Sequence, residues 1–137
     1  MAAYSSPSQS TASGSPLLFD QNGTSYGSAI SHTAGSGTFT INQTGLYRAD
    51  FHGVVSAPSN ANLPVGIVTS LTQKGSIVPG ASVPHNFQNK TETSPISFSV
   101  ALSVSTVPTT LQVVPVGNAS LNSAFTLTVT RLGNLTP

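Results

Sequence analysis

Residues 37–55 read GTFTINQTGLYRADFHGVV and hold the clearest structural pattern of the chain. At the start, Phe39 and Ile41 alternate with threonine and asparagine, which is typical of a half-buried strand. Residues 42–45 then have the asparagine, threonine and glycine of a turn. The stretch therefore predicts a short strand, a turn and a long strand of an antiparallel β fold.

The long strand, residues 45–56, has two different faces because successive side chains of a strand point to opposite sides. One face consists of Tyr47, Ala49, Phe51, Gly53 and Val55, and the other of Leu46, Arg48, Asp50, His52 and Val54. A face that carries arginine, aspartate and histidine normally meets water. What this polar face contacts is therefore the main functional question.

The composition excludes a nucleic-acid partner. Charged residues make up only 5% of the 137 residues, against about 25% in an ordinary soluble protein. The basic residues Arg48, Lys74, Lys90 and Arg131 are scattered along the chain, and the formal net charge is +1. A nucleic-acid surface needs clustered lysine and arginine.

The absence of cysteine removes both disulfides and thiol catalysis. Serine, threonine and asparagine supply the polarity, as in exported surface β-proteins, so we expect an extracellular location. A small exported domain without disulfides needs another source of stability, and burial in an oligomer is the obvious one. We expect neither a membrane span nor a signal peptide, because no long apolar run or charged-then-apolar leader is present.

Short strands separated by turns and prolines are expected along the chain, without helical periodicity. The expected strands are 17–20, 26–32, 38–42, 45–56, 64–73, 76–88, 95–105, 109–116 and 123–132. Residues 1–15 are rich in serine, alanine, proline and glycine, and we expect a flexible linker or an expression remnant there. The single domain then covers residues 16–134, and its many short strands argue for a sandwich or jelly roll.

The candidate core comes from the apolar faces of four expected strands. Large apolar residues alternate with serine in 95–105 and with threonine in 123–132. The expected core residues are Phe39, Ile41, Tyr47, Phe51, Phe98, Val100, Leu102, Phe125, Leu127 and Val129. They should fill the space between two sheets, and each fully buried phenylalanine contributes about 1.5–3 kcal/mol.

Several motifs resemble those of a known family. The segment 39–47, in which Thr-Gly-Leu-Tyr opens the long strand, looks like the B–C region of C1q/TNF-like jelly rolls. The match continues with PLLF at 16–19, YGSAIS at 26–31, GSIVPG at 75–80 and the final strand at 125–132. In order and spacing, residues 16–133 are similar to the C-terminal domain of BclA-like glycoproteins, collagen-like filament proteins of bacterial spore surfaces.

The resemblance implies an all-β, C1q/TNF-like jelly-roll sandwich of about ten antiparallel strands in two sheets, assembled as a homotrimer. In such trimers the sheet that contains the long strand packs around the threefold axis. Carried onto this sequence, the interface candidates are Leu46, Arg48, Asp50, His52, Ser97, Ser99, Ser103, Thr126, Thr128 and Thr130. Small side chains permit close packing, and copies of Arg48 and Asp50 can pair between subunits. The resemblance also implies an upstream collagen-like stalk and a place on the bacterial spore surface (exosporium) or cell surface.

Arg48, Asp50 and His52 alternate on one face, with Cβ atoms roughly 7 Å apart. One interpretation is a catalytic row completed by Ser97 or Ser99, and the other is a polar stripe that faces solvent or another subunit. A nucleophilic triad needs an oriented base and an oxyanion hole, and the chain has no Gly-x-Ser-x-Gly elbow. We therefore expect no catalytic residues and no enzyme activity.

A metal site is not expected either. The three histidines lie on separate expected elements, and the chain has only three carboxylate side chains. Zinc ligands usually include local pairs with a suitable spacing. We therefore expect no metal and no cofactor.

The polar segments 57–63 and 85–94 are the expected recognition loops, because binding residues concentrate on loops of rigid scaffolds. The ligand-contact candidates are Asn60, Asn62, Asn86 and Phe87. For Phe87 a second interpretation is that it covers the edge of the sandwich.

Two functions are compatible with the sequence. The first is a non-enzymatic head that trimerises and displays a bacterial collagen-like filament, with a structural or adhesive role and a host receptor or glycan as candidate partner. Trimerisation lowers the entropy cost of forming a triple helix, and three copies turn weak contacts into avidity. The alternative is a carbohydrate-binding domain or a phage or viral fibre head that binds a receptor. Fold alone does not distinguish them.

Overall fold

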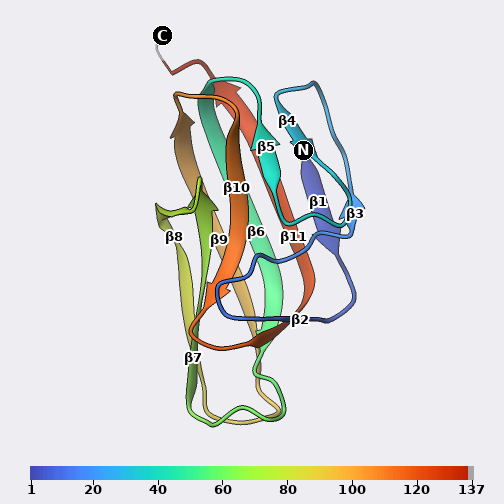
Figure 1. Cartoon of the computed structure of the whole chain (residues 1–137), viewed down its shortest axis with the longest axis vertical. Helices are drawn as coiled ribbons and strands as arrows, with labels where there is room; N and C mark the ends of the chain where they lie inside the picture. Colours follow the sequence, from blue (N-terminus) through green and yellow to red (C-terminus); the bar gives the residue numbers. More distant parts are fainter. Residues whose placement is uncertain (136–137) are drawn as a thin grey trace.

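Eleven strands form in residues 1–135, the part of the chain that the computed structural model describes (Figure 1). Their bounds are β1 (Ala2–Ser5), β2 (Gln9–Thr11), β3 (Gln21–Asn22), β4 (Ile30–His32), β5 (Phe39–Ile41), β6 (Gly45–Ser56), β7 (Val65–Gln73), β8 (Ser76–Phe87), β9 (Thr93–Val104), β10 (Thr109–Val116) and β11 (Ser120–Gly133). The bounds expected for the strands at 45–56 and 109–116 agree with those of β6 and β10.

The strands form two sheets that pack face to face (Figure 1). The six-stranded sheet has the order β3-β1-β11-β6-β9, and β2 also pairs with β11. The five-stranded sheet has the order β4-β5-β10-β7-β8. All these pairs are antiparallel. The structure therefore confirms the expected all-β sandwich of two antiparallel sheets.

Strand β6 lies in the interior of the six-stranded sheet. It pairs with β9 along its whole length, from Gly45 opposite Val104 to Ser56 opposite Thr93. On its other side it pairs with β11, where Phe51 lies opposite Leu127. Because side chains opposite one another in a sheet point to the same side, the apolar faces of the three strands combine.

The core lies between the sheets and contains the expected apolar residues. Nine of the ten expected core side chains are buried, and Val100 is half-buried against them. The ring of Phe19 meets Phe39 and Phe125 edge to face, with centroids 5.3 and 5.1 Å away. Each such aromatic pair adds about 0.5–1.5 kcal/mol beyond its buried area. The cluster therefore ties the segment before β3 to both sheets.

A glycine and a bulge make room for Phe125. A Cβ atom on Gly53 would lie 2.7 Å from the Cβ of Phe125, closer than atoms can pack. The register of β11 against β6 shifts between Ser123 and Thr126, and Ala124 has a φ of 49°. The bulge turns Phe125 into the core, where it is 1% exposed. Gly53 therefore has a packing role that its place on the apolar face does not reveal.

Residues 1–15 are not the expected flexible linker. Strand β1 pairs with β11 and β3, and β2 pairs with β11. Ala3 is fully buried in the core. Alanine and serine have low strand propensity, so the local sequence gives no strand signal, and the pairing edge of β11 induces the strands instead. The jelly-roll domain thus also includes strands that precede residue 16, the expected start of the domain 16–134.

Residues 17–20 are extended but form no strand of either sheet. The Leu17 amide donates to the carbonyl of Val113 at 2.9 Å, and the Phe19 amide donates to that of Ser36 at 3.2 Å. These single bonds go to different segments, so no ladder forms. Leu17 and Phe19 are nevertheless fully buried, which explains their alternation with exposed residues.

Replacing Ala3 by aspartate tests whether the first residues belong to the core. We expect Ala3→Asp to lower the free energy of unfolding by about 3 kcal/mol or more, because the substitution buries a charge without a partner. Denaturant unfolding at a fixed protein concentration measures the change. Ser8→Asp, at an exposed position between β1 and β2, should alter stability by no more than about 0.5 kcal/mol. Equal effects of both variants would show that residues 1–5 do not pack as described.

Candidate functional site

The outer face of the six-stranded sheet brings all ten predicted interface candidates onto one surface. We use "outer face" for Leu46, Arg48, Asp50, His52, Ser97, Ser99, Ser103, Thr126, Thr128 and Thr130, none of which is buried. The register forms rows across β11, β6 and β9, which are Thr126–His52–Ser97, Thr128–Asp50–Ser99 and Thr130–Arg48–Ala101. The surface is therefore made largely of short polar side chains, with a charged pair at its centre.

Asp50 is the hub of the polar contacts on the outer face. Its Oδ1 atom accepts a hydrogen bond from Arg48 Nε at 3.1 Å and a second from Ser99 Oγ at 2.6 Å. The Arg48 and Asp50 side chains are 57% and 40% exposed, and an ion pair in that setting contributes only about 0–1 kcal/mol. Oδ2 of Asp50 accepts no hydrogen bond from the described residues. The pair therefore contributes little to the stability of the fold.

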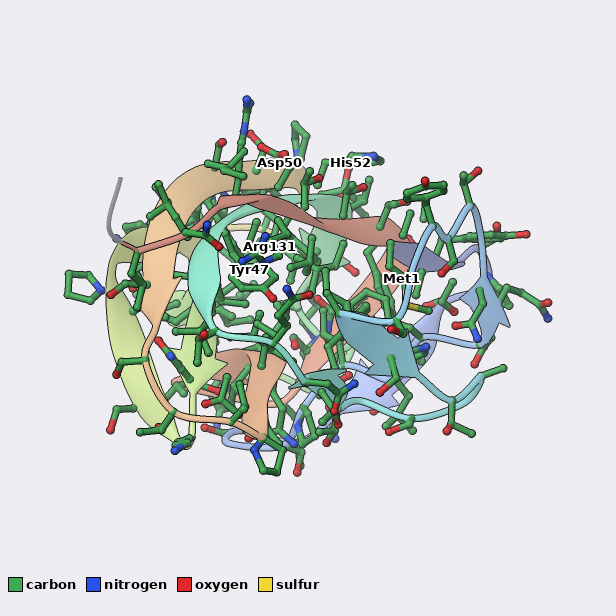
Figure 2. All side chains as sticks on the ribbon, turned by 90° about the horizontal axis from the view of Figure 1, so that it is seen from above. Met1, Tyr47, Asp50, His52 and Arg131 are labelled. Carbon is green, nitrogen blue, oxygen red and sulfur yellow. The ribbon has the colours of Figure 1, made fainter. Side chains whose placement is uncertain are left out.

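The outer face does not form the catalytic row that was the alternative interpretation. Ser99 donates directly to Asp50, so no imidazole stands between the hydroxyl and the carboxylate. Within residues 1–135 the ring of His52 has no hydrogen-bond partner, and Ser97 lies opposite it without a side-chain bond. Figure 2 shows Asp50 and His52 on the outside of the sheet, with Tyr47 and Arg131 on the inner side. The arrangement lacks the relay that a triad requires.

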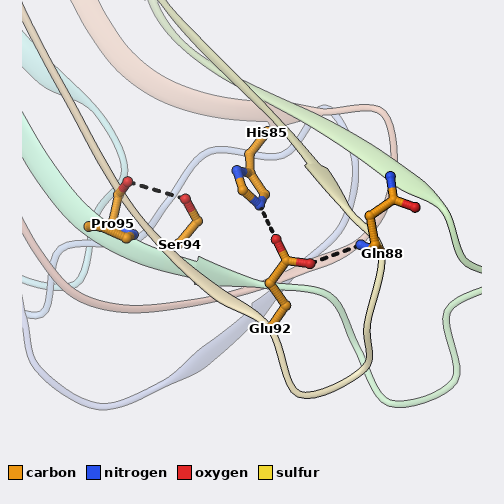
Figure 3. A network of polar contacts seen from close by, with 5 residues as sticks. All are labelled: His85, Gln88, Glu92, Ser94 and Pro95. Atoms are coloured by element: carbon orange, nitrogen blue, oxygen red, sulfur yellow. Dashed lines mark hydrogen bonds and ion pairs between the residues drawn. The ribbon is translucent and has the colours of Figure 1, made fainter.

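Glu92 holds the loop by which the chain crosses from β8 of the five-stranded sheet to β9 of the six-stranded sheet (Figure 3). Its Oε2 atom lies 2.6 Å from His85 Nε2, and its Oε1 atom accepts the Gln88 amide hydrogen at 2.9 Å. The hydrogen bond from the Gln88 backbone and that from His85 hold the pKa of Glu92 below its usual range. The ionised carboxylate of Glu92 therefore holds the loop 88–92 in place.

Serine, histidine and glutamate occur together at this end, yet they do not form a triad. Ser94 Oγ donates to the carbonyl of Pro95 at 3.3 Å and not to His85 (Figure 3). Ser94 is also only 9% exposed, so a substrate has little access to its hydroxyl. A nucleophile must be within hydrogen-bond reach of its base, and here it points elsewhere.

The predicted ligand-contact residues separate into two groups. Asn60, Asn62 and Asn86 are exposed, whereas Phe87 is fully buried. The Phe87 ring packs against His85 with centroids 4.5 Å apart. The prediction that Phe87 contacts a ligand is therefore wrong. Its burial fits the second interpretation, in which it covers the edge of the sandwich. Its polar neighbours in the sequence hid this role.

Loops 57–64 and 88–92 lie at the same end of the sandwich (Figure 1). Ser56 at the end of β6 pairs with Thr93 at the start of β9, so one loop begins where the other ends. This places Asn60 and Asn62 near the loop that contains Glu92. The three exposed asparagines offer both donors and acceptors to a ligand.

Two hollows on the surface had no signal in the sequence. The first, of about 340 Å³, lies where β8 and β9 meet, and its lining includes Gln73, Ile77, Pro79, Ala101, Leu102 and Ser103. The second, of about 290 Å³, lies on the exposed side of the five-stranded sheet, and its lining includes Ser70, Thr72, Ile77, Gln112, Val114 and Val116. Ile77 borders both hollows and is 59% exposed. Such hollows form between strands distant in sequence, so the sequence alone does not show them.

No metal-binding cluster is apparent in the described part of the chain. The carboxylate and imidazole side chains of residues 1–135 do not converge in groups of three or more.

Arg131 and Tyr47 hold the turn before β6 in place. Arg131, near the C-terminal end of β11, donates to the Thr44 carbonyl at 2.9 Å. Burial raises the pKa of the neighbouring Tyr47, an effect that Arg131 opposes, and the Tyr47 hydroxyl donates to the Gln43 carbonyl at 2.6 Å. Together these bonds fix the turn that precedes β6.

Comparisons with known proteins show the fold. The globular domain of the zebrafish complement 1qA protein superposes with a TM-score of 0.62 over 93% of each chain, at 14% identity. The EclA C-terminal domain, described as a sugar-binding protein, gives 0.46 at 13% identity over 92% of this chain and 79% of its own. The vertex protein P5 of PRD1 gives 0.43 at 17% identity over 86% and 84%. The last two scores are too low to support an argument.

The chain therefore has the C1q/TNF-like jelly-roll fold that its sequence predicts. No protein-family model matches the sequence, and no curated protein sequence matches it either. The particular resemblance to the BclA-like glycoproteins thus rests on the motifs in the sequence.

Neutralising Glu92 tests its contacts with His85 and Gln88 through the pH dependence of the unfolding free energy. Because the folded pKa lies below the ordinary value of 4.5, the ionised group stabilises the protein above that value, and the contribution is lost as the pH falls through the folded pKa. We expect Glu92→Gln, which keeps an oxygen for the Gln88 amide, to lose less stability than the wild type between about pH 6 and pH 3. Unfolding free energies across this range measure the difference. Superimposable profiles would contradict the assignment.

Proposed function

We propose that the protein is a non-enzymatic trimerisation head whose outer face packs around a threefold axis. The observation that carries the proposal is the outer face itself, where serine and threonine side chains surround the Arg48–Asp50 pair. Small side chains let sheets approach closely. Asp50 Oδ2 and the His52 ring have no partners among the described residues, so they are available to groups of another subunit.

A closed threefold ring needs two different surfaces on each subunit, because each copy contacts one neighbour with one surface and the next with the other. The hollow between β8 and β9 is a suitable second surface. Its lining is partly apolar, through Ile77, Pro79 and Leu102, and it shares Ser103 with the outer face. The two surfaces therefore meet at β9, as a compact ring requires. Burial of Ile77 in this contact removes an exposed apolar side chain from water.

The wider role we propose is surface display of a bacterial collagen-like filament, on the spore exosporium or the cell surface. The order and spacing of the BclA-like motifs support this role. A trimeric head would align three chains for a collagen-like stalk. No segment of residues 1–135 folds as a helix capable of crossing a bilayer. A Gly-X-Y tract upstream in the gene would support the stalk, and neighbouring tail-fibre genes would favour a fibre head.

A carbohydrate or receptor ligand is the second candidate function, and the exposed asparagines of the loop end favour it. We expect Asn60→Ala combined with Asn62→Ala to reduce binding on a glycan array about tenfold or more if this end contacts sugar. Thr40→Ala, on the exposed side of β5, is the control and should bind like the wild type. Absence of wild-type binding to any glycan, or equal binding of all variants, would remove the loop end as a sugar site.

The trimer can be tested by the molar mass in solution. We expect the wild type to have three times the mass of one chain in light scattering at micromolar concentration. Thr128→Arg places a long charged side chain in the centre of the outer face, so it should give the mass of one chain. Thr40→Arg makes the same change on the opposite sheet and should leave the trimer intact. A monomeric wild type, or dissociation by Thr40→Arg alone, would overturn the proposal.

A further inference from the structure

Tyr4 lies on the same side of the six-stranded sheet as the outer face. Strand β1 pairs with β11 (Figure 1), and Tyr4 lies opposite Thr126. Because opposite side chains point to the same side of a sheet, the row of side chains continues beyond β11. It runs Gln21–Tyr4–Thr126–His52–Ser97 across five strands. The surface proposed for assembly therefore continues onto the first strand of the chain.

Tyr4 is the only large side chain of β1, which otherwise consists of alanine and serine. Its neighbours Ala3 and Ser5 point into the sandwich and are buried, whereas Tyr4 is 39% exposed and lies outside the core. Tyrosine combines a large rigid ring with a polar hydroxyl, and exposed rings of this kind anchor contacts between proteins. The ring of Tyr4 is therefore a candidate contact residue and not a core residue.

The ring of Tyr4 lies beside the segment that follows β3. A Cβ atom on Gly23 would lie 3.8 Å from Cδ1 of Tyr4, so the edge of the ring is next to this glycine. The Gly23 amide donates to the Ala2 carbonyl at 2.8 Å, and the Ala2 amide donates to the Thr24 carbonyl at 3.0 Å. These bonds hold the backbone around the ring, and an ordered side chain loses little freedom on binding. Tyr26, in the same segment, is fully exposed.

The three strands of the outer face are too narrow for a stable contact between subunits. From Leu46 to His52 the rows extend about 20 Å along the strands, and β11, β6 and β9 together are about 14 Å wide. The resulting flat area of about 300 Å² is well below the roughly 800 Å² that each partner buries in a specific interface. Because β9 is the last strand on one side, the sheet widens only towards β1 and β3.

We propose that Tyr4 anchors the contact between copies of this chain. The inference rests on the trimer proposed above, and it adds β1 to the surface by which one copy meets the next. Gln21 and Thr126, the neighbours of Tyr4 in the row, are uncharged, so burial of the ring against a second copy removes no adjacent charge from water. On assembly the ring of Tyr4 becomes buried, whereas Tyr26 stays in water.

Nitration of the tyrosines tests the contact on the full chain. The chain has three tyrosines, of which Tyr47 is fully buried and Tyr26 fully exposed. Tetranitromethane modifies accessible tyrosine rings, and mass mapping locates the nitro groups. Because the centre of an interface excludes water, we expect Tyr4 in the wild-type trimer to react about tenfold more slowly than Tyr26 or slower still. Leu46→Arg places a charge at the far end of the outer face, and its one-chain form should react at Tyr4 in proportion to the exposed fraction.

Two results of this experiment would contradict different claims. Reaction of Tyr4 in the wild-type trimer in proportion to its exposed fraction would overturn the inference and leave the trimer intact. Protection of Tyr4 in the one-chain form of Leu46→Arg would overturn it as well, because the fold alone would then shield the ring. A wild type with the mass of one chain would overturn the trimer itself.

Tyr4→Ser and Tyr26→Ser are a matched pair, because each removes an exposed ring. Tyr4→Ser should raise the dissociation constant of the trimer about tenfold or more, and Tyr26→Ser should leave it unchanged. Tyr4→Phe keeps the ring and should assemble nearly as the wild type does. If Tyr4 only strengthens its pairing with Thr126, Tyr4→Ser will lower the stability to denaturant without changing the dissociation constant, and that result would overturn the inference.

Discussion

The register of β6 between β9 and β11 is the constraint on which the structure depends. A slip of one residue would exchange the two faces of the strand and place Arg48, Asp50 and His52 between the sheets. The core would then lose Tyr47 and Phe51, and it would gain a charged pair without water. Twelve consecutive pairs with β9 and the turn anchored by Arg131 fix the alignment. The polar outer face is thus a consequence of the same register that builds the core.

This register also separates the regions to which roles can be assigned. The outer face belongs to the middle of the six-stranded sheet, and the asparagine loops lie at one end of the sandwich. Each region therefore changes without disturbing the packing of the next, because strands and buried phenylalanines lie between them. The proposed display role would benefit from this arrangement, since the outer face lies on a sheet while the loops are open to variation.

The alternating pattern made the long strands and most of the core predictable, because period-two burial is local information. The resemblance to C1q/TNF-like trimers, and not the pattern itself, placed the outer-face residues of three strands on one surface, as the register shows. Strands β1 and β2 were hidden because a distant partner, β11, induces them in a sequence of low strand propensity. Phe87 lies in both the expected strand 76–88 and the expected loop 85–94, and its polar neighbours favoured the loop although the residue ends β8. The contacts of His32 with Asn22 and Ser36 depend on atom positions that no sequence pattern contains.

The neighbouring positions of β1 and β11 have a mechanical consequence. The two strands are antiparallel, and Ala2 at the start of one lies opposite Thr128 towards the end of the other. A pulling force between the two ends of the chain would therefore open this pair from one end, one hydrogen bond at a time, as a zipper opens. Sheared strands resist with all their bonds at once, but peeled strands do not. In a tethered protein, β1 would be the first element to yield under load, and it would expose the edge of β11 while the aromatic core stayed closed.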